Sequence, residues 1–227
     1  MAVQKLHFRV AGGNDLAIEV NRLVIAGWTG RDREAVDHHI RELEALGVCP
    51  PASVPTFYPL AASLLTTADL VEVPRKDSSG EVECVLLSAE SGLYVGVGSD
   101  HTDRKVEAYD VTVSKQMCAK PVGKEVWRFD EVAAHWDQLE MRCWRTCDGV
   151  RALYQEGSVT RLLDPRDLMT RLTGEDALPV GTALFGGTQA VIGALGYGEQ
   201  FEIELHDPVL KRSLRHTYQV KCLEVAE

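Results

Sequence analysis

The sequence has 227 residues, 45% of them hydrophobic and 26% charged, and its formal net charge is −10. This length and composition predict a soluble globular protein, with either one large domain or a small lobe plus a main one. The acidity, without a cluster of lysines and arginines, argues against nucleic acid and anionic membranes as partners. No apolar run reaches the roughly eighteen residues that span a bilayer, and residues 1–10 lack the pattern of a signal peptide.

The N-terminal residues are predicted to form β-strands. Residues 6–10 alternate between apolar and polar side chains, which is typical of a half-buried strand. A Gly-Gly-Asn-Asp turn follows, and the apolar and β-branched residues of 16–20 and 23–26 indicate further strands.

A helix is predicted over residues 32–46, because Val36, Ile40 and Leu43 lie on one face at positions i, i+4 and i+7. The proline-rich stretch 49–59 follows it. We predict an ordered loop or a linker there, since proline fits neither a helix interior nor a central strand.

The middle of the chain is predicted to combine strands with two helices. Residues 70–113 look rich in strands, with 77–80 as a turn. Residues 129–143 are predicted to be helical, because large apolar side chains recur on one face. Another helix is predicted to begin at Asp164, where an N-cap is followed by a first-turn proline, and to end at Leu172.

The last part of the chain returns to strands, predicted at 182–185, 201–205 and 216–220. Strands and helices do not alternate regularly along the sequence, which argues against a doubly wound parallel sheet. We therefore predict a mainly β, α+β fold.

The six cysteines include no Cys-x-x-Cys pair, and Cys143 and Cys147 form the closest pair. The chain is too large and too well supplied with apolar residues to need a disulfide scaffold. We interpret the cysteines as free thiols, which predicts a reducing, cytoplasmic location.

Two acidic side chains, Glu81 and Glu83, are separated by one residue in a predicted strand. Side chains at i and i+2 of a strand point to the same face, where two carboxylates repel each other unless a cation lies between them. The pair therefore indicates either a metal site or the polar outer face of a half-exposed sheet.

A second polar cluster lies at residues 99–104, with the sequence Ser-Asp-His-Thr-Asp-Arg. Oxygen-rich clusters of this kind suit Mg²⁺, Mn²⁺ or Ca²⁺. The same residue types form hairpin turns, in which the side chain of Asp100 would accept a local hydrogen bond. The sequence of this segment leaves both interpretations open.

His39 and Glu42 lie three positions apart in the predicted helix and are neighbours on its surface. A carboxylate beside an imidazole raises its basicity and fixes its orientation, as a general base requires. The alternative is an ordinary surface pair, and His38 is a second candidate partner for the glutamate.

The segment from Gly186 to Thr188 follows an apolar strand, and its glycines would let the backbone approach a ligand and offer N–H groups to an oxyanion. A β-bulge or tight turn is the alternative. Lys115 and Lys120 could polarise a carbonyl near a metal, although lysine is ordinarily a surface residue.

The order of these motifs resembles that of the fumarylacetoacetate hydrolase superfamily. Its members carry an HxxE dyad, a proline-rich stretch, an ExE pair, an aspartate in an N-D-V-S/T-A-R-D segment, a lysine and a G-T-P-x-G-V-G turn. The corresponding residues here are His39 and Glu42, residues 50–59, Glu81 and Glu83, Asp100 with Thr102 and Arg104, Lys115, and Gly187 to Gly193. The resemblance covers about residues 24–220, and its specificity lies in the collinear order of short motifs.

The chain departs from the superfamily pattern at several positions. Only 17 positions separate Glu83 from Asp100, which is short for the family, and Asp110 is a rival for the third acidic position. We favour Asp100, because Arg104 and the preceding Val-Gly-Val-Gly fit the pattern better. Gln189 stands where the family has proline, so the chain is identified as a divergent member.

The resemblance implies a mixed β-sheet roll of the fumarylacetoacetase C-terminal-like type, with a few peripheral helices. It implies a single domain over residues 1–227. Residues 1–60 would supply N-terminal strands and a helix or lid segment, and residues 61–227 would form the catalytic β-roll.

The resemblance also implies roles for the acidic residues and the dyad. Glu81, Glu83 and Asp100 would hold Mg²⁺ or Mn²⁺ and leave positions open for substrate and water. His39, oriented by Glu42, would activate the water.

Other site residues would act on the substrate. Lys115 and Thr188 would stabilise oxyanionic charge. Arg104 would brace the third metal ligand or bind a substrate carboxylate, and Gly187 and Gln189 would contact the substrate.

The implied reaction is hydrolysis of a C–C bond in a 2-oxo acid or 1,3-dicarbonyl substrate of the acylpyruvate type, through a metal-stabilised enolate. Decarboxylation, hydration or isomerisation of a 2-oxo acid would use the same site, so the ligands do not separate these reactions. The third hypothesis is a non-catalytic small-molecule-binding protein that kept the fold. The expected partner is a small molecule, with no nucleic acid and no membrane, and family members are commonly homodimers.

Overall fold

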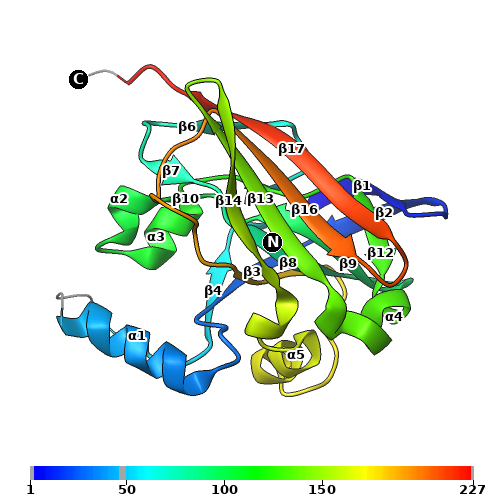
Figure 1. The fold of residues 1–227 in the computed structure, drawn as a ribbon. Helices are drawn as coiled ribbons and strands as arrows, with labels where there is room; N and C mark the ends of the chain where they lie inside the picture. The colour runs from blue at the N-terminus through cyan, green and yellow to red at the C-terminus, as the bar shows by residue number, and fades with distance from the viewer. Residues whose placement is uncertain (1–2, 46–49, 226–227) are drawn as a thin grey trace.

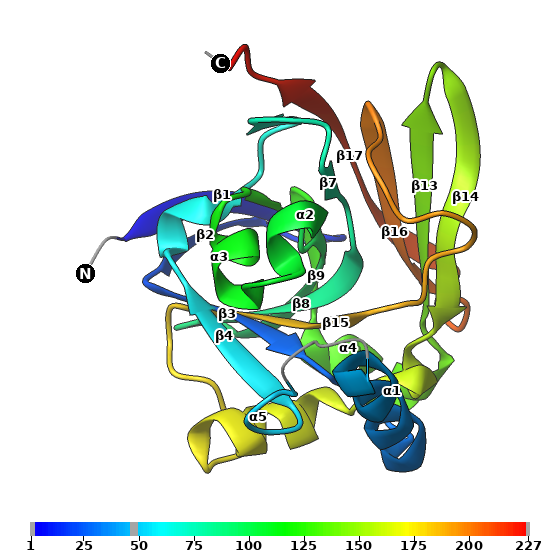
Figure 2. The ribbon, with the colours of Figure 1, turned by 90° about the vertical axis from the view of Figure 1, so that its left-hand side faces the viewer.

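The structure, a computed structural model, consists mainly of β-strands in two sheets that stand side by side (Figure 1, Figure 2). It describes residues 3–45 and 50–225, without the side chains of His39 and Leu43. The sheets are mixed, and the helices lie around them. The predicted mainly β fold with few peripheral helices is confirmed.

The first sheet has eight strands in the order β2-β1-β12-β9-β8-β15-β3-β4. Most neighbours are antiparallel, but β1 pairs with β12 and β15 pairs with β3 in parallel. The strands are β1 (Gln4–Val10), β2 (Asp15–Val20), β3 (Arg22–Gly27), β4 (Thr56–Leu60), β8 (Val82–Ala89), β9 (Gly92–Ser99), β12 (Glu125–Arg128) and β15 (Thr182–Thr188).

The second sheet has five strands in the order β14-β13-β16-β17-β6, and two short ladders pair β7 with β10 and β5 with β11. The strands of the second sheet are β6 (Leu70–Val73), β13 (Glu140–Cys147), β14 (Val150–Ser158), β16 (Gln200–Asp207) and β17 (Arg212–Cys222). The short ladders consist of β5 (Leu65–Thr66), β7 (Ser78–Ser79), β10 (Thr102–Asp103) and β11 (Lys120–Pro121).

The helices are short. In Figure 2, α2 and α3 lie in front of the first sheet, and α1 lies near its lower edge. The α-helices are α1 (Arg33–Ala45), α2 (Arg104–Glu107), α3 (Val111–Gln116), α4 (Phe129–Val132) and α5 (Pro165–Thr173), and the 3-10 helices are η1 (Ala62–Leu64), η2 (Ala133–Gln138) and η3 (Val159–Arg161). None of the described helices is long and apolar enough to cross a lipid bilayer.

The first sheet is buried on both faces, which explains why β8 is a nearly continuous apolar run. Val82 and Leu86 of β8 pack between the two sheets with Ile203 of β16. Val85 of β8 belongs to a second core, made by the strands of the first sheet as they curl around it. Because successive side chains of a strand point to opposite faces, Glu83 lies on the same inner face as Val85.

Two helices form where the sequence predicts them. α1 covers the predicted 32–46 up to Ala45, beyond which the residues lie outside the described part of the chain. α5 begins after Asp164, whose carboxylate accepts a hydrogen bond from the backbone N–H of Arg166 at 2.8 Å. Gly174 ends it in the left-handed conformation, with φ of 81°.

The predicted helix over 129–143 is wrong in its second half. Helical structure ends at Gln138, and β13 follows. Leu139, Met141 and Cys143 are fully buried and alternate with polar side chains. This period of two is that of a strand, and pairing with β16 in the second sheet satisfies it.

The predicted loop at 49–59 is partly wrong, because Thr56–Leu60 forms β4 at the edge of the first sheet. An edge strand accommodates Pro59, which has no N–H group to donate. The predicted turn at 77–80 contains β7, which pairs with β10.

The predicted strand-rich segment 70–113 is helical beyond Asp103. Asp103 accepts hydrogen bonds from the N–H groups of Lys105 and Val106, at 3.0 and 2.9 Å, and so caps α2. Aspartate is a strong N-cap residue, and this signal for a helix start outweighs the β-branched residues that follow.

The described cysteines are free. Cys84, Cys118 and Cys143 are buried and Cys147 and Cys222 half-buried, whereas Cys49 lies outside the described residues. Burial raises the pKa of Cys118 to about 11, so this thiol stays protonated at neutral pH.

Gly98 of β9 lies opposite Glu83 and has no space for a side chain. A Cβ atom there would lie 2.6 Å from Cγ2 of Val85 and 2.9 Å from Cε1 of Phe185. We expect Gly98→Ala to lower the free energy of unfolding by about 1–3 kcal/mol, the usual cost of overpacking a core, measured by urea denaturation. Gly96→Ala is the matched control, since its Cβ would lie 3.4 Å from its nearest neighbour. Equal stability of the two variants would contradict this expectation.

Candidate metal centre

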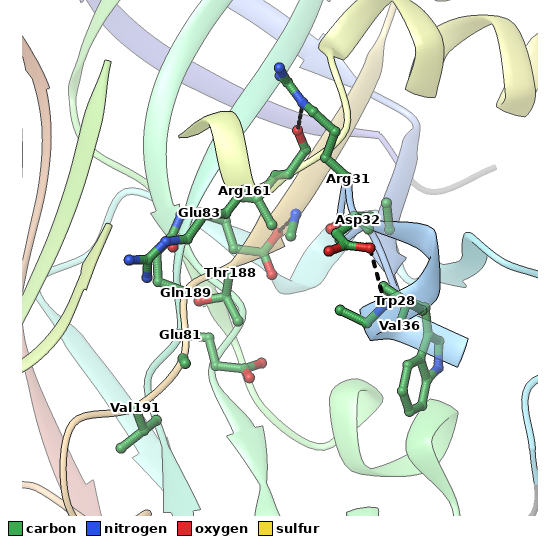
Figure 3. Close-up of a pocket in the computed structure, with 18 of the residues that line it drawn as sticks. Trp28, Arg31, Asp32, Val36, Glu81, Glu83, Arg161, Thr188, Gln189 and Val191 are labelled. Atoms are coloured by element: carbon green, nitrogen blue, oxygen red, sulfur yellow. Dashed lines mark hydrogen bonds between the residues drawn. The ribbon is translucent and has the colours of Figure 1, made fainter. Parts of the chain in front are cut away.

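A cleft of about 950 Å³ opens where β8 and β15 meet α1, α3 and η3. Glu81, Glu83, Lys115 and Thr188 line it. Figure 3 shows the two glutamates and Thr188 within this pocket, with Asp32 of the α1 N-terminus on the other side.

The pairing of β8 with β9 brings three carboxylates together. Glu83 lies opposite Gly98, and just beyond the ladder the N–H of Asp100 donates to the carbonyl of Glu81 at 3.0 Å. All three acidic side chains therefore point to one face of the hairpin. One carboxylate oxygen from each of Glu81, Glu83 and Asp100 lies within 4.8 Å of the others.

Glu83 is 2% exposed, and its carboxylate accepts a hydrogen bond from the N–H of Gly187 at 2.7 Å. A bulge in β15 delivers this N–H, with Gly187 at φ of 101°. A side chain at this position would bring a Cβ within 1.8 Å of Oγ1 of Thr29, so the contact requires glycine. Burial, and then the charges of Asp100 and Glu81, raise the pKa of Glu83 well above its usual value.

Asp100 is fully buried between two lysines. The ammonium of Lys115 donates to Oδ2, and Nζ of Lys120 lies 2.9 Å from Oδ1. Burial alone would raise the pKa of Asp100, but the two positive charges outweigh it and hold the pKa well below its usual value. Asp100 is therefore ionised at neutral pH.

Glu81 is held by Arg104, whose Nη2 lies 3.1 Å from Oε1, while Nζ of Lys115 lies 3.8 Å from Oε2. The pKa of Glu81 is nevertheless raised, because burial outweighs these two cations. Arg104 also binds Glu107 at 2.7 Å and the hydroxyl of Ser79 at 2.7 Å. Arg104 thus binds Glu81. One of the two roles predicted from the sequence, a contact with Asp100, is replaced by this contact.

The site carries more negative than positive charge. Four carboxylates, including Glu107, face three cations, and Glu83 has no ion pair with a lysine or arginine among the described residues. Hard divalent cations bind such oxygen donors, and opposite ligands of Mg²⁺ lie about 4.2 Å apart. The observed spacing needs little closure, so the cluster fits a divalent metal ion.

Asp110, the rival third ligand, lies outside this cluster. Its carboxylate caps α3 by accepting a hydrogen bond from the N–H of Val113 at 2.9 Å, and it is exposed. A sequence signal for this outcome exists in the hairpin itself. With the β-turn at Glu90 and Ser91, antiparallel pairing sets Asp100 opposite Glu81.

Thr188 and Gln189 are engaged by the protein itself. The hydroxyl of Thr188 donates to the carbonyl of Val82 at 2.8 Å and accepts from Nε2 of Gln155 at 2.9 Å. The amide of Gln189 donates to the carbonyl of Ser158 at 3.1 Å. Both residues line the cleft, but these contacts serve to hold the end of β15.

Gln155 is a site residue that the sequence did not reveal. It is fully buried, its Oε1 accepts from the N–H of Val82 at 3.0 Å, and its Nε2 reaches the carbonyl of Gln189 at 2.6 Å. It therefore ties β8 to β15 beside the carboxylates. A single glutamine in a strand carries no local signal for such a role.

The predicted dyad lies on α1, whose N-terminal residues line the cleft. The side chain of His39 lies outside the described residues, so its pairing with Glu42 stays a prediction. Nδ1 of His38 lies 3.5 Å from Oε1 of Glu42, with both side chains exposed. Asp32 caps the helix through the N–H of Ala35 at 3.1 Å.

His101 points away from the carboxylates. Its Nδ1 lies 3.1 Å from the hydroxyl of Tyr218 and its Nε2 2.9 Å from that of Ser78. Burial, reinforced by the charge of Lys120, lowers the pKa of His101 to about 3, so the ring is neutral. The hydroxyl of the tyrosine also lies 2.8 Å from that of Ser99, and through this network the imidazole supports the end of β9, next to Asp100.

A family model described as a protein of unknown function, DUF2848, matches residues 26–218. The chain belongs to this family. No curated protein matches the sequence significantly.

Several solved structures share the fold of this DUF2848 chain. Yeast ynq8, a fumarylacetoacetate hydrolase family protein, is 15% identical with a TM-score of 0.63, over 91% of this chain and 95% of that one. Cg1458 is 15% identical with a TM-score of 0.59, over 93% and 83%. A 2-keto-3-deoxy-D-arabinonate dehydratase complexed with magnesium and 2,5-dioxopentanoate is 16% identical with a TM-score of 0.58, over 93% and 78%. The predicted resemblance to the fumarylacetoacetate hydrolase superfamily is thereby confirmed for the fold.

Exchange of Asp100 for asparagine tests the charge balance of the site. Asp100→Asn would leave two buried ammonium groups without their shared partner, so we expect a loss of about 3–5 kcal/mol in the free energy of unfolding, measured in urea with a chelator present. Asp110→Asn is the control and should change stability by less than about 0.5 kcal/mol, because asparagine caps helices as well as aspartate does. Similar losses in both variants would contradict the assignment.

Proposed function

We propose that the protein is a divalent-metal-dependent enzyme that hydrolyses a C–C bond in a 2-oxo acid or 1,3-dicarbonyl substrate of the acylpyruvate type. The observation that carries the proposal is the convergence of three buried carboxylates in a cleft large enough for a small molecule. Glu83 is the sharpest part of it, because it is buried beside two other carboxylates and has no lysine or arginine partner in the described chain, so a cation there would compensate its charge.

The solved relatives support a 2-oxo acid as the substrate class. One of them, a dehydratase of a 2-keto-3-deoxy sugar acid, was solved with magnesium. A bound divalent ion would supply a Lewis acid that draws negative charge from a carbonyl or enolate oxygen. We propose Mg²⁺ or Mn²⁺, held by Glu81, Glu83 and Asp100.

Lys115 would act as a fixed positive charge at the substrate. Burial would lower its pKa, but the charges of Asp100 and Glu81 raise it, so the ammonium keeps its proton. It lies on the cleft wall beside the ring of Tyr58, 5.9 Å from the ring centroid. From there it can donate a hydrogen bond to an oxyanion, but it cannot serve as a base.

His39, oriented by Glu42, would activate water for hydrolysis. α1 brings its first turn to the cleft, and His39 follows Val36 of the cleft lining by three residues on this helix. Residues that supply a general base typically contribute about 10²–10⁴-fold to the rate. Decarboxylation of a 2-oxo acid needs no activated water, and dehydration needs a different proton transfer.

A lyase is the second candidate function. The observation that favours it is that the magnesium-bound relative is a dehydratase. The carboxylate cluster would serve either reaction, so the choice rests on the dyad.

Metal binding can be measured as stabilisation. With Mg²⁺ or Mn²⁺ at about 100 times its Kd, we expect the free energy of unfolding to rise by about 2.7 kcal/mol. Glu83→Gln should abolish this rise while leaving the metal-free protein at least as stable as wild type, because the substitution removes repulsion from Glu81 and Asp100. Asp110→Asn should keep the rise. If wild type gains no stability from either ion, the enzyme proposal fails.

The two reactions can be separated through His39. We expect His39→Ala to lower kcat for acylpyruvate hydrolysis by about 10²–10⁴-fold, as loss of a general base does, and His38→Ala to leave it within a few-fold of wild type. Assays with acylpyruvate and oxaloacetate on the same preparations compare the two reactions. Decarboxylation of oxaloacetate that persists in His39→Ala, with no hydrolysis in wild type, would favour the lyase.

A further inference from the structure

Three positively charged side chains line the cleft, and two of them are already paired. Arg31 binds Asp137 through two hydrogen bonds, at 2.7 and 3.0 Å, and Lys115 binds Asp100. Arg161 also lines the cleft, and it makes no ion pair with any described carboxylate. Among the described residues it is therefore the cleft cation whose guanidinium is available to a ligand.

The backbone of Arg161 is firmly held. η3 ends at this residue and is capped by Ser158, whose hydroxyl accepts from the N–H of Thr160 at 3.1 Å. The N–H of Arg31 donates to the carbonyl of Arg161 at 2.8 Å, and the next residue, Leu162, bridges to Gly30. The side chain thus projects from a fixed base, not from a loose loop.

The side chain of Arg161 runs along the cleft wall beside Gln189 (Figure 3). Glycine at position 157 makes room for both, since a Cβ there would lie 2.1 Å from Oε1 of Gln189 and 3.2 Å from Nη1 of Arg161. A glycine within a strand weakens it. Here it allows a guanidinium to lie close to the sheet.

The carboxylate cluster and Arg161 lie beside the two ends of one short stretch of the cleft wall, from Gly187 to Gln189. Gly187 holds the carboxylate of Glu83, and Gln189 lies two residues further along the chain. Two residues of extended backbone span about 7 Å. A 2-oxo acid bound head-first at the carboxylate cluster would therefore present the far end of a chain of about five carbons to Arg161.

We propose that Arg161 is a specificity residue that binds a second carboxylate at the far end of the substrate, so that the preferred substrate is a dicarboxylic 2-oxo acid. This inference rests on the proposed function, because it uses the metal centre to hold the first end. Guanidinium binds carboxylate through two parallel hydrogen bonds, with directional selectivity that an ammonium lacks. In an acidic protein with Asp32 and Glu107 also in the cleft, a dianion needs such a local cation.

The test compares two ligands of equal length. 2-Oxoglutarate and 2-oxopentanoate share a 2-oxo acid head and a five-carbon chain, and differ in the terminal carboxylate. With Mg²⁺ present, calorimetric titration should show wild type binding 2-oxoglutarate at least about tenfold more tightly, the effect of one charge-assisted contact. Arg161→Gln should remove this preference while binding oxalate and 2-oxopentanoate as wild type does, and Arg161→Lys should keep part of it.

Arg166→Gln is the matched control. Arg166 lies on α5, is exposed, and stacks over Phe129 outside the cleft, so the variant loses the same charge without touching the site. An unchanged Mg²⁺-dependent stabilisation of Arg161→Gln shows that the variant folds and keeps its metal centre.

The outcomes separate the two proposals. Three results would overturn the role of Arg161 and leave the metal enzyme standing, provided that wild type binds oxalate in a Mg²⁺-dependent way. They are no preference of wild type for 2-oxoglutarate, a preference that survives in Arg161→Gln, and a preference that disappears equally in Arg166→Gln. Absence of Mg²⁺-dependent oxalate binding in wild type would overturn the proposed function and this inference with it.

Discussion

The antiparallel pairing of β8 with β9 is the constraint on which the site depends. The register that sets Glu83 opposite Gly98 also sets Asp100 beside Glu81. A slip of one residue would turn all these side chains to the opposite face, where they would meet the core between the two sheets. Apolar packing on both faces of β8 therefore fixes the position of the carboxylates as well as that of the core.

Burial makes the balance of charge around these carboxylates demanding. Removing a charged group from water costs several kcal/mol unless a partner compensates it. Lys115 and Lys120 compensate Asp100, and Arg104 compensates Glu81. Glu83 is stabilised mainly by a hydrogen bond from a backbone N–H. A bound cation would compensate the rest of its buried charge. The fold thus maintains a local electrostatic cost, which the proposed metal ion would offset.

Support for the site comes from strands far apart in the sequence. Gln155 ties β8 to β15, and the bulge at Gly187 turns an N–H towards Glu83. Gln189 stands where the superfamily has proline, and its amide donates to the carbonyl of Ser158, so its contact with a substrate stays a prediction. The neighbouring Arg161 lines the cleft wall, where the far end of the proposed substrate would lie.

The sequence by itself determined those features that depend on local pattern. Alternation in a strand put Glu81 and Glu83 on one face, the N-cap at Asp164 began α5, and the collinear order of short motifs led to the fold. Local pattern also gave one wrong prediction. The spacing of Trp136 and Leu139 suits a helix through Cys143, but β13 begins at Glu140.

Only the tertiary structure decided what depends on long-range pairing. It buried Lys120 against Asp100, placed Gln155 between β8 and β15 beside the carboxylates, and brought Arg161 to the cleft. These residues carry no signal of their own, because a glutamine or an arginine acquires its role from neighbours more than twenty positions away. The free energy that places them comes from packing the two sheets together. A short stretch of sequence gives no information about that packing, because the packed residues are far apart along the chain.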